Sequence, residues 1–405
     1  MSRRARAIAF VAGALSLVAA RQAGAQSKRE LNFVPLIGGN SDVGVGGGVL
    51  GDWAQLAPGH PAFKWRLELA SITTFKPQNG HLIVPYTDNY LELVVPKAGP
   101  GQRLRIDARL SYTDERTMKY SGLGNASPPP PEGDEIARSE YGRIHPTASL
   151  EVRTRVFDSF YVLGGANYTY DALSVGADTI LAQDHAMGPP EVRAILGNFD
   201  RHGVALLTAE AQIDTRDDEI VTRHGQFHTL RFRASPRVGD ALPYGYERLT
   251  LTSRIYRTPS DRWLTLAARV VGDALLGDPP FYELARFDET NAIGGVNAVR
   301  GVPAQRYYGK VKAFGNLEAI SPLWPFHLRN KAYVLGAAVF FDAGRSWTEL
   351  THAHPELDGT GLGLKYGIGG GIRLQEGRTF LLRLDVAWSP DATPIGAYFA
   401  AGEIF

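Results

Sequence analysis

Polar and apolar residues alternate one by one along most of the chain. From residue 103 to residue 112 the odd-numbered positions are charged or hydroxylated, and the even-numbered positions are apolar or tyrosine. Residues 63–69 and 380–388 show the same alternation. A period of two residues places the two sets on opposite faces of a β-strand. The pattern therefore predicts a chain built of strands, with almost no helix.

Sixteen segments carry this alternation, and the connections between them differ in length. Residues 116–141, 173–201 and 276–307 form long loops, whereas residues 155–158 and 375–378 form tight turns. An even number of strands, with short turns at one end and long loops at the other, is typical of bacterial outer-membrane barrels. The predicted strands are 31–38, 42–54, 62–76, 81–97, 101–115, 142–156, 159–172, 202–215, 225–236, 246–257, 262–275, 308–320, 331–343, 361–374, 379–389 and 395–405.

The charged faces of these strands distinguish a soluble sheet from a membrane barrel. A soluble sheet of this size needs a covering layer of helices, and the sequence predicts none. A membrane barrel turns its apolar face to lipid and its charged face to a wet lumen. After residue 25 the longest uncharged apolar run is 332–341, about half of the roughly 20 residues that a spanning helix needs. The sequence therefore predicts an all-β fold, a single transmembrane antiparallel β-barrel of about 16 strands.

The first 25 residues have the pattern of a secretory signal peptide. Three arginines among residues 3–6 precede an apolar stretch at 7–20, and the small residues 23–25 fit a cleavage site. An uncleaved anchor helix is the alternative, although the apolar stretch is short for a membrane span. We therefore expect an exported protein with a signal peptide at 1–25, a short lead at 26–30 and the barrel at 31–405.

Composition removes several classes of function. The chain of 405 residues has a formal net charge of +1, so no basic field indicates nucleic-acid binding. It contains no cysteine, which excludes thiolate chemistry, disulfides and Cys–zinc sites. His352, His354 and Glu356 could hold zinc, and Asp217–Glu219 could hold calcium, but polar turns are the simpler interpretation of both segments. We expect no catalytic residues, no metal and no cofactor.

Several segments of the second half resemble one known family. Ile293–Val302, with the sequence IGGVNAVRGV, resembles the inward-folded sixth loop of BamA/TamA-type barrels. These barrels form the outer-membrane assembly factor superfamily, also called bacterial surface antigen proteins. Val302 departs from the family, which usually has an aromatic residue after the Arg-Gly pair. Further similar segments, in family order, are the turn at 214–217 with 223–225, Gly336–Gly344 ending in VFFDAG, the glycine-rich 361–373, the strand around 383–385 and the C-terminal Phe405.

The resemblance implies a short form of the family, without the periplasmic polypeptide-transport-associated domains. It implies a barrel in the outer membrane of a Gram-negative bacterium that helps to insert or translocate outer-membrane polypeptides or lipids. Its expected partners are outer-membrane lipids and lipopolysaccharide, the assembly machinery for its own insertion, a separate periplasmic partner and client polypeptides. A passive pore with a plug loop in its lumen is the alternative function.

A candidate ion pair follows from strand alternation. In the segment 333–342, the odd-numbered residues are all apolar and must face lipid, so Asp342 points into the lumen. Glycines on the inner face of the next strand leave room there for a loop. A loop that carries Arg300 could fill this space, with the guanidinium forked onto Asp342 or, alternatively, Asp385. A mobile surface loop with a solvated Arg300 is the other possibility. The predicted loop motif is Gly294, Gly295, Val299 and Gly301 around Arg300.

A lateral seam is expected where the first and last strands meet. Glycine offers no side chain for packing and so weakens strand pairing. Gly38 and Gly39 lie at the end of the first strand, and Gly396 and Gly402 lie in the last, which ends at Phe405. Opening this seam would be the mechanism by which such a barrel passes a client into the membrane.

Overall fold

A computed structural model describes residues 29–404 except 57–62, 100, 102, 220, 261–262, 288–292, 329–330, 353, 377–379 and 392–394. The expected signal peptide at 1–25 and most of the lead at 26–30 lie outside the described residues. The strands are β1 Arg29–Asn40, β2 Gly44–Gln55, β3 Trp65–Gln78, β4 His81–Ile83, β5 Tyr86–Ala98, β6 Leu104–Lys119, β7 Glu140–Ile144, β8 Thr147–Phe157, β9 Phe160–Ser174, β10 His202–Asp214, β11 Gly225–Ser235, β12 Tyr246–Ser260, β13 Leu264–Gly277, β14 Val311–Leu328, β15 Lys331–Trp347, β16 Lys365–Glu376, β17 Phe380–Trp388 and β18 Gly396–Ala401.

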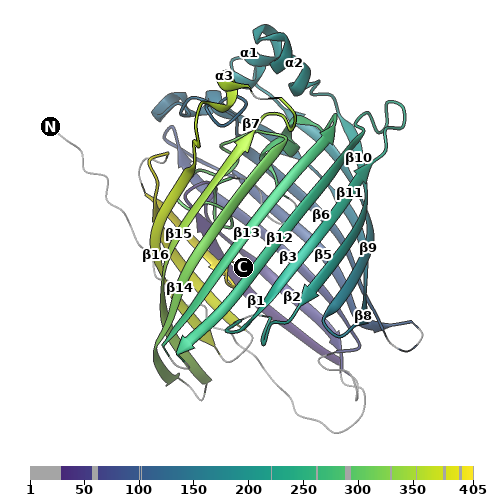
Figure 1. Ribbon diagram of the computed structural model, residues 1–405, viewed down its shortest axis with the longest axis vertical. Coiled ribbons are helices and arrows are strands. Elements are labelled where there is room, and N and C mark those ends of the chain that lie inside the picture. The colour runs from purple at the N-terminus through teal and green to yellow at the C-terminus, as the bar shows by residue number, and fades with distance from the viewer. Residues whose placement is uncertain are drawn as a thin grey trace, which may run out of the picture.

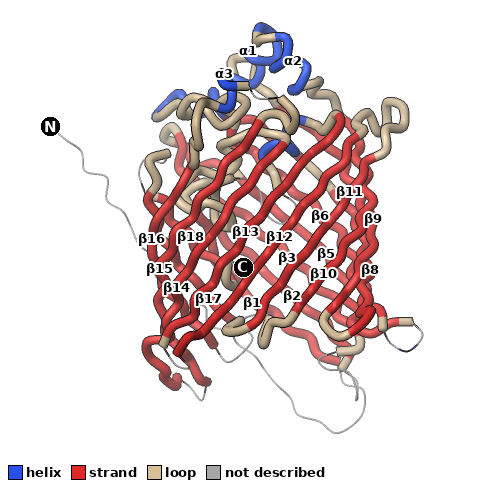
Figure 2. The backbone as a smooth tube through the Cα atoms, viewed as in Figure 1, coloured by secondary structure: helices blue, strands red, loops and turns tan. Residues whose placement is uncertain are grey.

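These elements form one closed antiparallel β-barrel (Figures 1 and 2). Each strand pairs with its neighbours along the chain, and β1 pairs with β18 to close the ring. Two short elements continue longer strands across a break. β4 and β5 both pair with β3, while β7 and β8 both lie between β6 and β9. The barrel wall therefore has 16 strands, which confirms the prediction.

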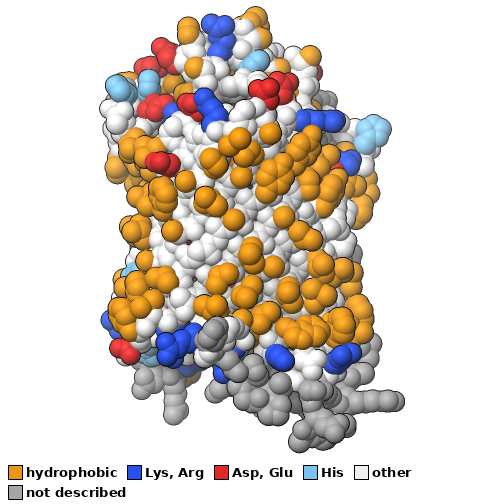
Figure 3. Space-filling view, turned by 90° about the vertical axis from the view of Figure 1, so that its right-hand side faces the viewer, with side chains coloured by type: hydrophobic (Ala, Val, Ile, Leu, Met, Phe, Trp, Pro, Cys, Tyr) orange, Lys and Arg blue, Asp and Glu red, His pale blue; other side chains and the backbone are white. Residues whose placement is uncertain are grey.

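The outside of the barrel is apolar and the inside is polar, as the alternation predicts. On β15, the odd-numbered Val339 and Phe341 are 65% and 45% exposed, whereas the even-numbered Phe340 and Asp342 are buried. Figure 3 shows apolar side chains over the wall, with charged side chains gathered at the two ends. No helix among the described residues is long and apolar enough to cross a membrane.

The two ends of the barrel differ in their connections. A short turn at 158–159 joins β8 and β9 at one end, whereas 120–139, 175–201, 278–310 and 348–364 are the long connections of the other end. Short turns are periplasmic and long loops are extracellular in barrels of this kind. We use these names for the two ends below.

Helices appear where the sequence predicted only loops. The helices α1 Ile180–Met187, α2 Pro190–Leu196 and α3 Pro355–Asp358 lie at the extracellular end (Figure 1). Thr179 caps α1 by accepting a hydrogen bond from the Ala182 amide, and Pro190 begins α2 at a position that needs no amide donor. Period-two analysis missed them because each is about two turns or less. With the 3-10 helix Phe281–Ala285 and nearby aromatic residues, α1 and α2 form an apolar dome over the lumen.

Most strand boundaries differ from the prediction by a few residues, and three of the differences lie near the lumen's contents or the end of the chain. β14 continues to Leu328, eight residues beyond its expected end at 320, because it forms a long hairpin with β15. β16 begins at Lys365, so residues 361–364 belong to the preceding loop. β18 ends at Ala401, since Gly402 takes a φ of +79° that turns the chain out of the wall.

Candidate functional site

The long connection between β13 and β14 folds into the barrel in its described parts, residues 278–287 and 293–310. We call these residues the lumenal loop. Ile293, Val299 and Val302 are fully buried and pack in one cluster with Phe314 of β14. The loop reverses direction through Gly294 and Gly295, whose φ angles of +130° and +86° suit glycine and are rare for other residues. The loop is therefore part of the interior rather than a mobile surface segment.

Arg300 lies at the centre of the lumenal loop's attachment. Its Nε lies 2.7 Å from Oδ2 of Asp342, and its Nη2 lies 3.0 Å from Oδ1 of the same carboxylate. The backbone N–H of Arg300 also donates to Asp342 Oδ2 at 3.1 Å. A third side-chain nitrogen, Nη1, contacts Glu318 at 2.5 Å and Asp385 at 3.0 Å. Both expected partners, Asp342 and Asp385, therefore contact Arg300 together, with Glu318 as a third.

The barrel wall is shaped to receive the guanidinium and the backbone beside it. The Arg300 guanidinium carbon lies 3.3 Å from the ring centroid of Phe340, in a cation–π contact. A Cβ at Gly367 on β16 would lie 1.8 Å from the Arg300 carbonyl oxygen, so only glycine fits there. Gly301 has a φ of +91° and passes close to the backbone of Trp388. The inner-face glycine at 367 thus leaves the space that the sequence predicted for a loop.

A larger charge network surrounds this contact. Arg373 on β16 contacts Asp385 at 2.5 Å and Glu318 at 3.6 Å, and Arg383 on β17 contacts Asp385 at 3.3 Å. With Arg300 and Asp342 these residues form what we call the Arg300 cluster, three arginines facing three carboxylates. Burial opposes the charge on Arg300, but the carboxylates outweigh it and raise the pKa of the guanidinium, which therefore stays protonated.

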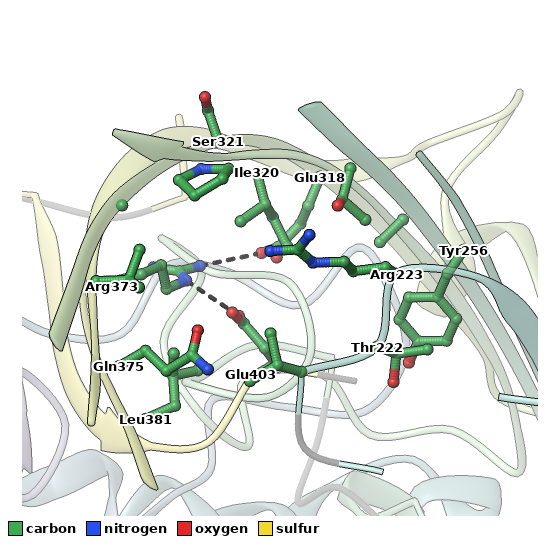
Figure 4. Close-up of a pocket in the computed structure, with 16 residues that line it drawn as sticks. Thr222, Arg223, Tyr256, Glu318, Ile320, Ser321, Arg373, Gln375, Leu381 and Glu403 are labelled. Carbon is green, nitrogen blue, oxygen red and sulfur yellow. Dashed lines mark hydrogen bonds and ion pairs between the residues drawn. The ribbon is translucent and has the colours of Figure 1, made fainter. Parts of the chain in front are cut away.

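The C-terminal residues also enter the lumen. Glu403 pairs with Arg373 at 3.0 Å (Figure 4), and the Ile404 carbonyl accepts a hydrogen bond from Arg269 on β13 at 2.8 Å. Arg269 also donates to the Asn297 carbonyl of the lumenal loop at 2.5 Å. Burial raises the pKa of the Glu403 carboxyl, and Arg373 opposes that shift. A cavity of about 60 Å³ beside Glu403 is lined by Arg223, Glu318 and Arg373 among others (Figure 4).

The seam between β1 and β18 is short. Only Gly39 opposite Phe399 and Asn40 opposite Tyr398 pair across it in the described chain, with one further bond from the Ser41 amide to the Ala397 carbonyl. On its other edge, β1 pairs with β2 along all of Arg29–Asn40. Residues 29–38 of β1 therefore present an edge that β18 does not cover.

The expected seam residues take different positions. Gly38 and Gly39 lie at the seam, with a Cβ at Gly38 only 3.8 Å from the Phe399 ring. Gly396 pairs with Ala387 on β17 and lies beyond the last paired residue of β1, and Gly402 follows the strand. The expectation that both lie within the seam pairing is therefore wrong for these two glycines. Phe405 lies outside the described residues.

Several residues of the site were not predicted from the sequence. Glu318 and Asn316 share the inner face of β14, so alternation predicts that they point inward. Nothing in the sequence indicates that they meet Asp342, to which Asn316 donates at 2.8 Å, because strand register fixes that contact. Tyr398 and Asp42, which both contact the lumenal loop, carry no motif at all.

The candidate metal sites do not assemble. His354 lies 3.7 Å from Glu356, and His352 contacts its neighbour Thr351. Asp217 accepts two backbone amides, from Arg223 and from the residue after it, as a turn does. Within the described residues no group of three or more His, Asp or Glu side chains is arranged to hold a metal ion.

Residues 204–405 match the model of the Omp85 superfamily domain. The chain carries an Omp85 superfamily domain. The match begins at β10 and contains the last nine wall strands, the lumenal loop and the whole Arg300 cluster. No curated protein has a significantly similar sequence.

Two solved structures share the fold of this Omp85 barrel. BamA from Haemophilus ducreyi lacking POTRA domains 1–3 aligns with a TM-score of 0.61 at 15% identity, covering 93% of this chain and 70% of that one. CdiB from Escherichia coli aligns with a TM-score of 0.56 at 14% identity, covering 92% of this chain and 62% of that one. At these identities the likeness shows the fold alone, a barrel of the BamA type.

Proposed function

We propose that this Omp85 barrel inserts or translocates polypeptides or lipids at the outer membrane of a Gram-negative bacterium, through an opening between β1 and β18. The observation that carries the proposal is the short seam. Two paired positions join β1 to β18, whereas β1 and β2 pair at twelve. Separating the seam therefore breaks few hydrogen bonds and opens the wall toward lipid.

The uncovered part of β1 gives the opening a chemical use. Residues 29–38 have backbone donors and acceptors on the seam edge that no strand of the described chain satisfies. An unpaired strand edge is a template for another strand. A client strand can pair with this edge while its apolar side chains pass into lipid.

The proposal includes the partners that the family resemblance implies. The wall contacts outer-membrane lipids and lipopolysaccharide, and general assembly machinery inserts the barrel itself. A separate periplasmic protein delivers the client polypeptide to the periplasmic end. Export depends on a signal peptide at 1–25, so N-terminal mass spectrometry of outer-membrane fractions should find the mature chain beginning near residue 26.

The test is reconstitution in liposomes with the seam free or locked. The chain has no cysteine, and Asn40 lies directly opposite Tyr398, so an Asn40→Cys/Tyr398→Cys pair gives an unambiguous cross-link across the seam. Leu31→Cys/Trp53→Cys is the matched control, because these opposed residues join β1 to β2 instead. We expect the free barrel and the cross-linked control to accelerate folding of a client barrel, and the locked seam to abolish the effect.

A passive pore, the alternative, would give a different result. Ion conductance without any acceleration of client folding, unchanged by the seam cross-link, would refute the proposal in favour of a channel. The lumenal loop and the dome both fill the lumen, so we expect low conductance from the closed barrel.

A further inference from the structure

The lumenal loop touches β18 on one side of the seam and the turn that follows β1 on the other. The contact with β18 is made by Gly301, whose backbone N–H donates to the Tyr398 hydroxyl oxygen at 2.8 Å. Tyr398 is 1% exposed, and its ring packs against Phe340, Ala387 and Val296 of the loop. Because Asn40 is the residue opposite Tyr398, this contact lies at the point where the seam is paired.

The contact beside β1 is made three residues later in the loop, with the turn between β1 and β2. The Ala304 amide donates to Oδ1 of Asp42 at 3.1 Å, directly after the end of β1. Asp42 itself is held in place, since its own amide donates to the Asn40 side chain at 2.9 Å. Lys76 on β3 donates to the carbonyls of Ser41 and Asp42 at 3.2 and 3.0 Å.

On either side of these two contacts the loop is anchored to other parts of the barrel. Arg300, one residue before Gly301, contacts β14 through Glu318, β15 through Asp342 and β17 through Asp385. Tyr307, three residues after Ala304, donates to Asp391 in the loop before β18 at 2.8 Å. The segment from Arg300 to Tyr307 is thus fixed at both ends while it bridges β18 and the turn that follows β1.

We propose that the lumenal loop staples the seam shut, with Tyr398 and Asp42 as the positioning residues on its two sides. The seam has only three backbone contacts of its own in the described chain, so two hydrogen bonds from the loop are a large part of what holds it. Opening the seam requires at least one of the two to break. This inference rests on the proposed function only in taking the seam as the opening, and it assigns the loop as the element that controls it.

Both hydrogen bonds from the loop to the seam are donated by backbone amides, of Gly301 and Ala304, which suits a contact that holds the seam closed. Backbone amides cannot swing away as side chains do, and the Arg300 cluster fixes the backbone that carries them. A client or partner that displaces Arg300 from its carboxylates would release both sides of the seam at once. The Arg300 cluster therefore controls the seam through the loop, without touching β1.

Hydrogen exchange measures the staple directly and needs no client. The Ser41 amide bonds across the seam, and peptides that span the paired residues 39–41 and 397–399 report its opening. Exchange through local opening is proportional to the open fraction. Tyr398→Phe removes the hydroxyl and keeps the ring, and Asp42→Ala removes the carboxylate. Because one hydrogen bond contributes roughly 0.5–1.5 kcal/mol, we expect each variant to speed seam exchange about two- to tenfold.

Three controls separate a staple from general loosening. Tyr366→Phe removes the hydroxyl of a tyrosine on the lipid-facing side of β16, and Asp52→Ala breaks a pair with Asn32 between β1 and β2. Neither should change seam exchange. Asp42→Asn keeps an acceptor oxygen without the charge and should bring seam exchange back to the wild-type rate or below it. In every variant the β12–β13 amides should keep their protection.

The outcomes decide the inference in each direction. Faster exchange confined to the seam in Tyr398→Phe and Asp42→Ala, with rescue by Asp42→Asn, supports the staple. Unchanged seam exchange, or faster exchange in the lumenal loop alone, overturns it, since the two contacts would then only seat the loop. If the seam loosens as expected but client folding in liposomes is not accelerated, the staple stands and the proposed function fails.

Discussion

Replacing Arg300 with alanine tests the interior of the barrel most directly. The substitution removes four side-chain hydrogen bonds to three buried carboxylates. Asp385 keeps Arg373 and Arg383 as partners, and Glu318 keeps Arg373. Asp342 is fully buried. Among the described contacts of its carboxylate it keeps two donors, the Asn316 side-chain amide and the backbone N–H of residue 300, and neither is charged. The variant therefore leaves one carboxylate without a compensating cation.

The magnitude follows from that orphaned charge. Breaking a buried pair by removing one partner costs about 3–5 kcal/mol. Asp342→Ala should cost less, about 1.5–3 kcal/mol, because Arg300 keeps Glu318 and Asp385. The double variant removes the orphaned carboxylate and should open no more readily than Arg300→Ala alone. Arg300→Lys keeps the positive charge but cannot donate two parallel hydrogen bonds to Asp342. It should therefore retain less than half of the stability that Arg300→Ala loses.

The assay is hydrogen exchange of the lumenal loop in detergent micelles, with limited proteolysis as a second readout. The Gly295 amide, which bonds to the Val302 carbonyl at 2.8 Å, reports whether the loop is in place. Arg109→Ala is the control, because Arg109 is a half-exposed lumen arginine that pairs with Glu92 away from the loop. Strictly additive losses in the double variant, or an Arg300→Ala effect no larger than the control's, would refute the assigned contact.

Three further results are expected. Leu150 on β8 faces lipid and is 49% exposed, and Leu150→Arg should reduce folding stability in lipid by roughly 2–4 kcal/mol. Ser149→Arg, at the adjacent residue that faces the lumen, should cost less. Equal losses would contradict the assigned faces. Gly367→Ala should displace the lumenal loop at about 1–3 kcal/mol, visible as faster loop exchange, whereas Gly164→Ala, where a Cβ meets nothing within 4 Å, should be neutral. Burial raises the pKa of Asp42 above its ordinary 3.8, so the closed seam, which buries this carboxyl, is favoured below that pH and loses stability as the pH rises through the raised value. Seam exchange corrected for intrinsic rates should therefore increase over that window, and Asp42→Asn should abolish the dependence.

The sequence by itself determined the barrel. A period of two residues needs only neighbouring positions, so the faces of β15 and the count of wall strands follow from local composition. The same rule placed Asp342 inside and Val339 outside. The short helices escaped it because segments of seven or eight residues in a loop give too little pattern to detect.

The candidate site was determined only in part. Alternation and a glycine-rich loop were enough to pair Arg300 with Asp342 or Asp385 as alternatives. Tertiary structure made them simultaneous partners, because the guanidinium has more donors than one carboxylate can accept, and strand register brings Glu318 to the same point. Register depends on the alignment of whole strands, and no residue of β14 carries that information alone.

The end of the chain and the seam were decided by tertiary structure alone. Local pattern favours a last strand that runs through residue 405, yet Gly402 turns out of the wall and Glu403 pairs with Arg373 inside. The contacts of Tyr398 and Asp42 with the lumenal loop join residues that are 97 and 262 positions from their partners. Such contacts arise only when the barrel closes and the loop enters it, because closure sets which distant residues share the lumen.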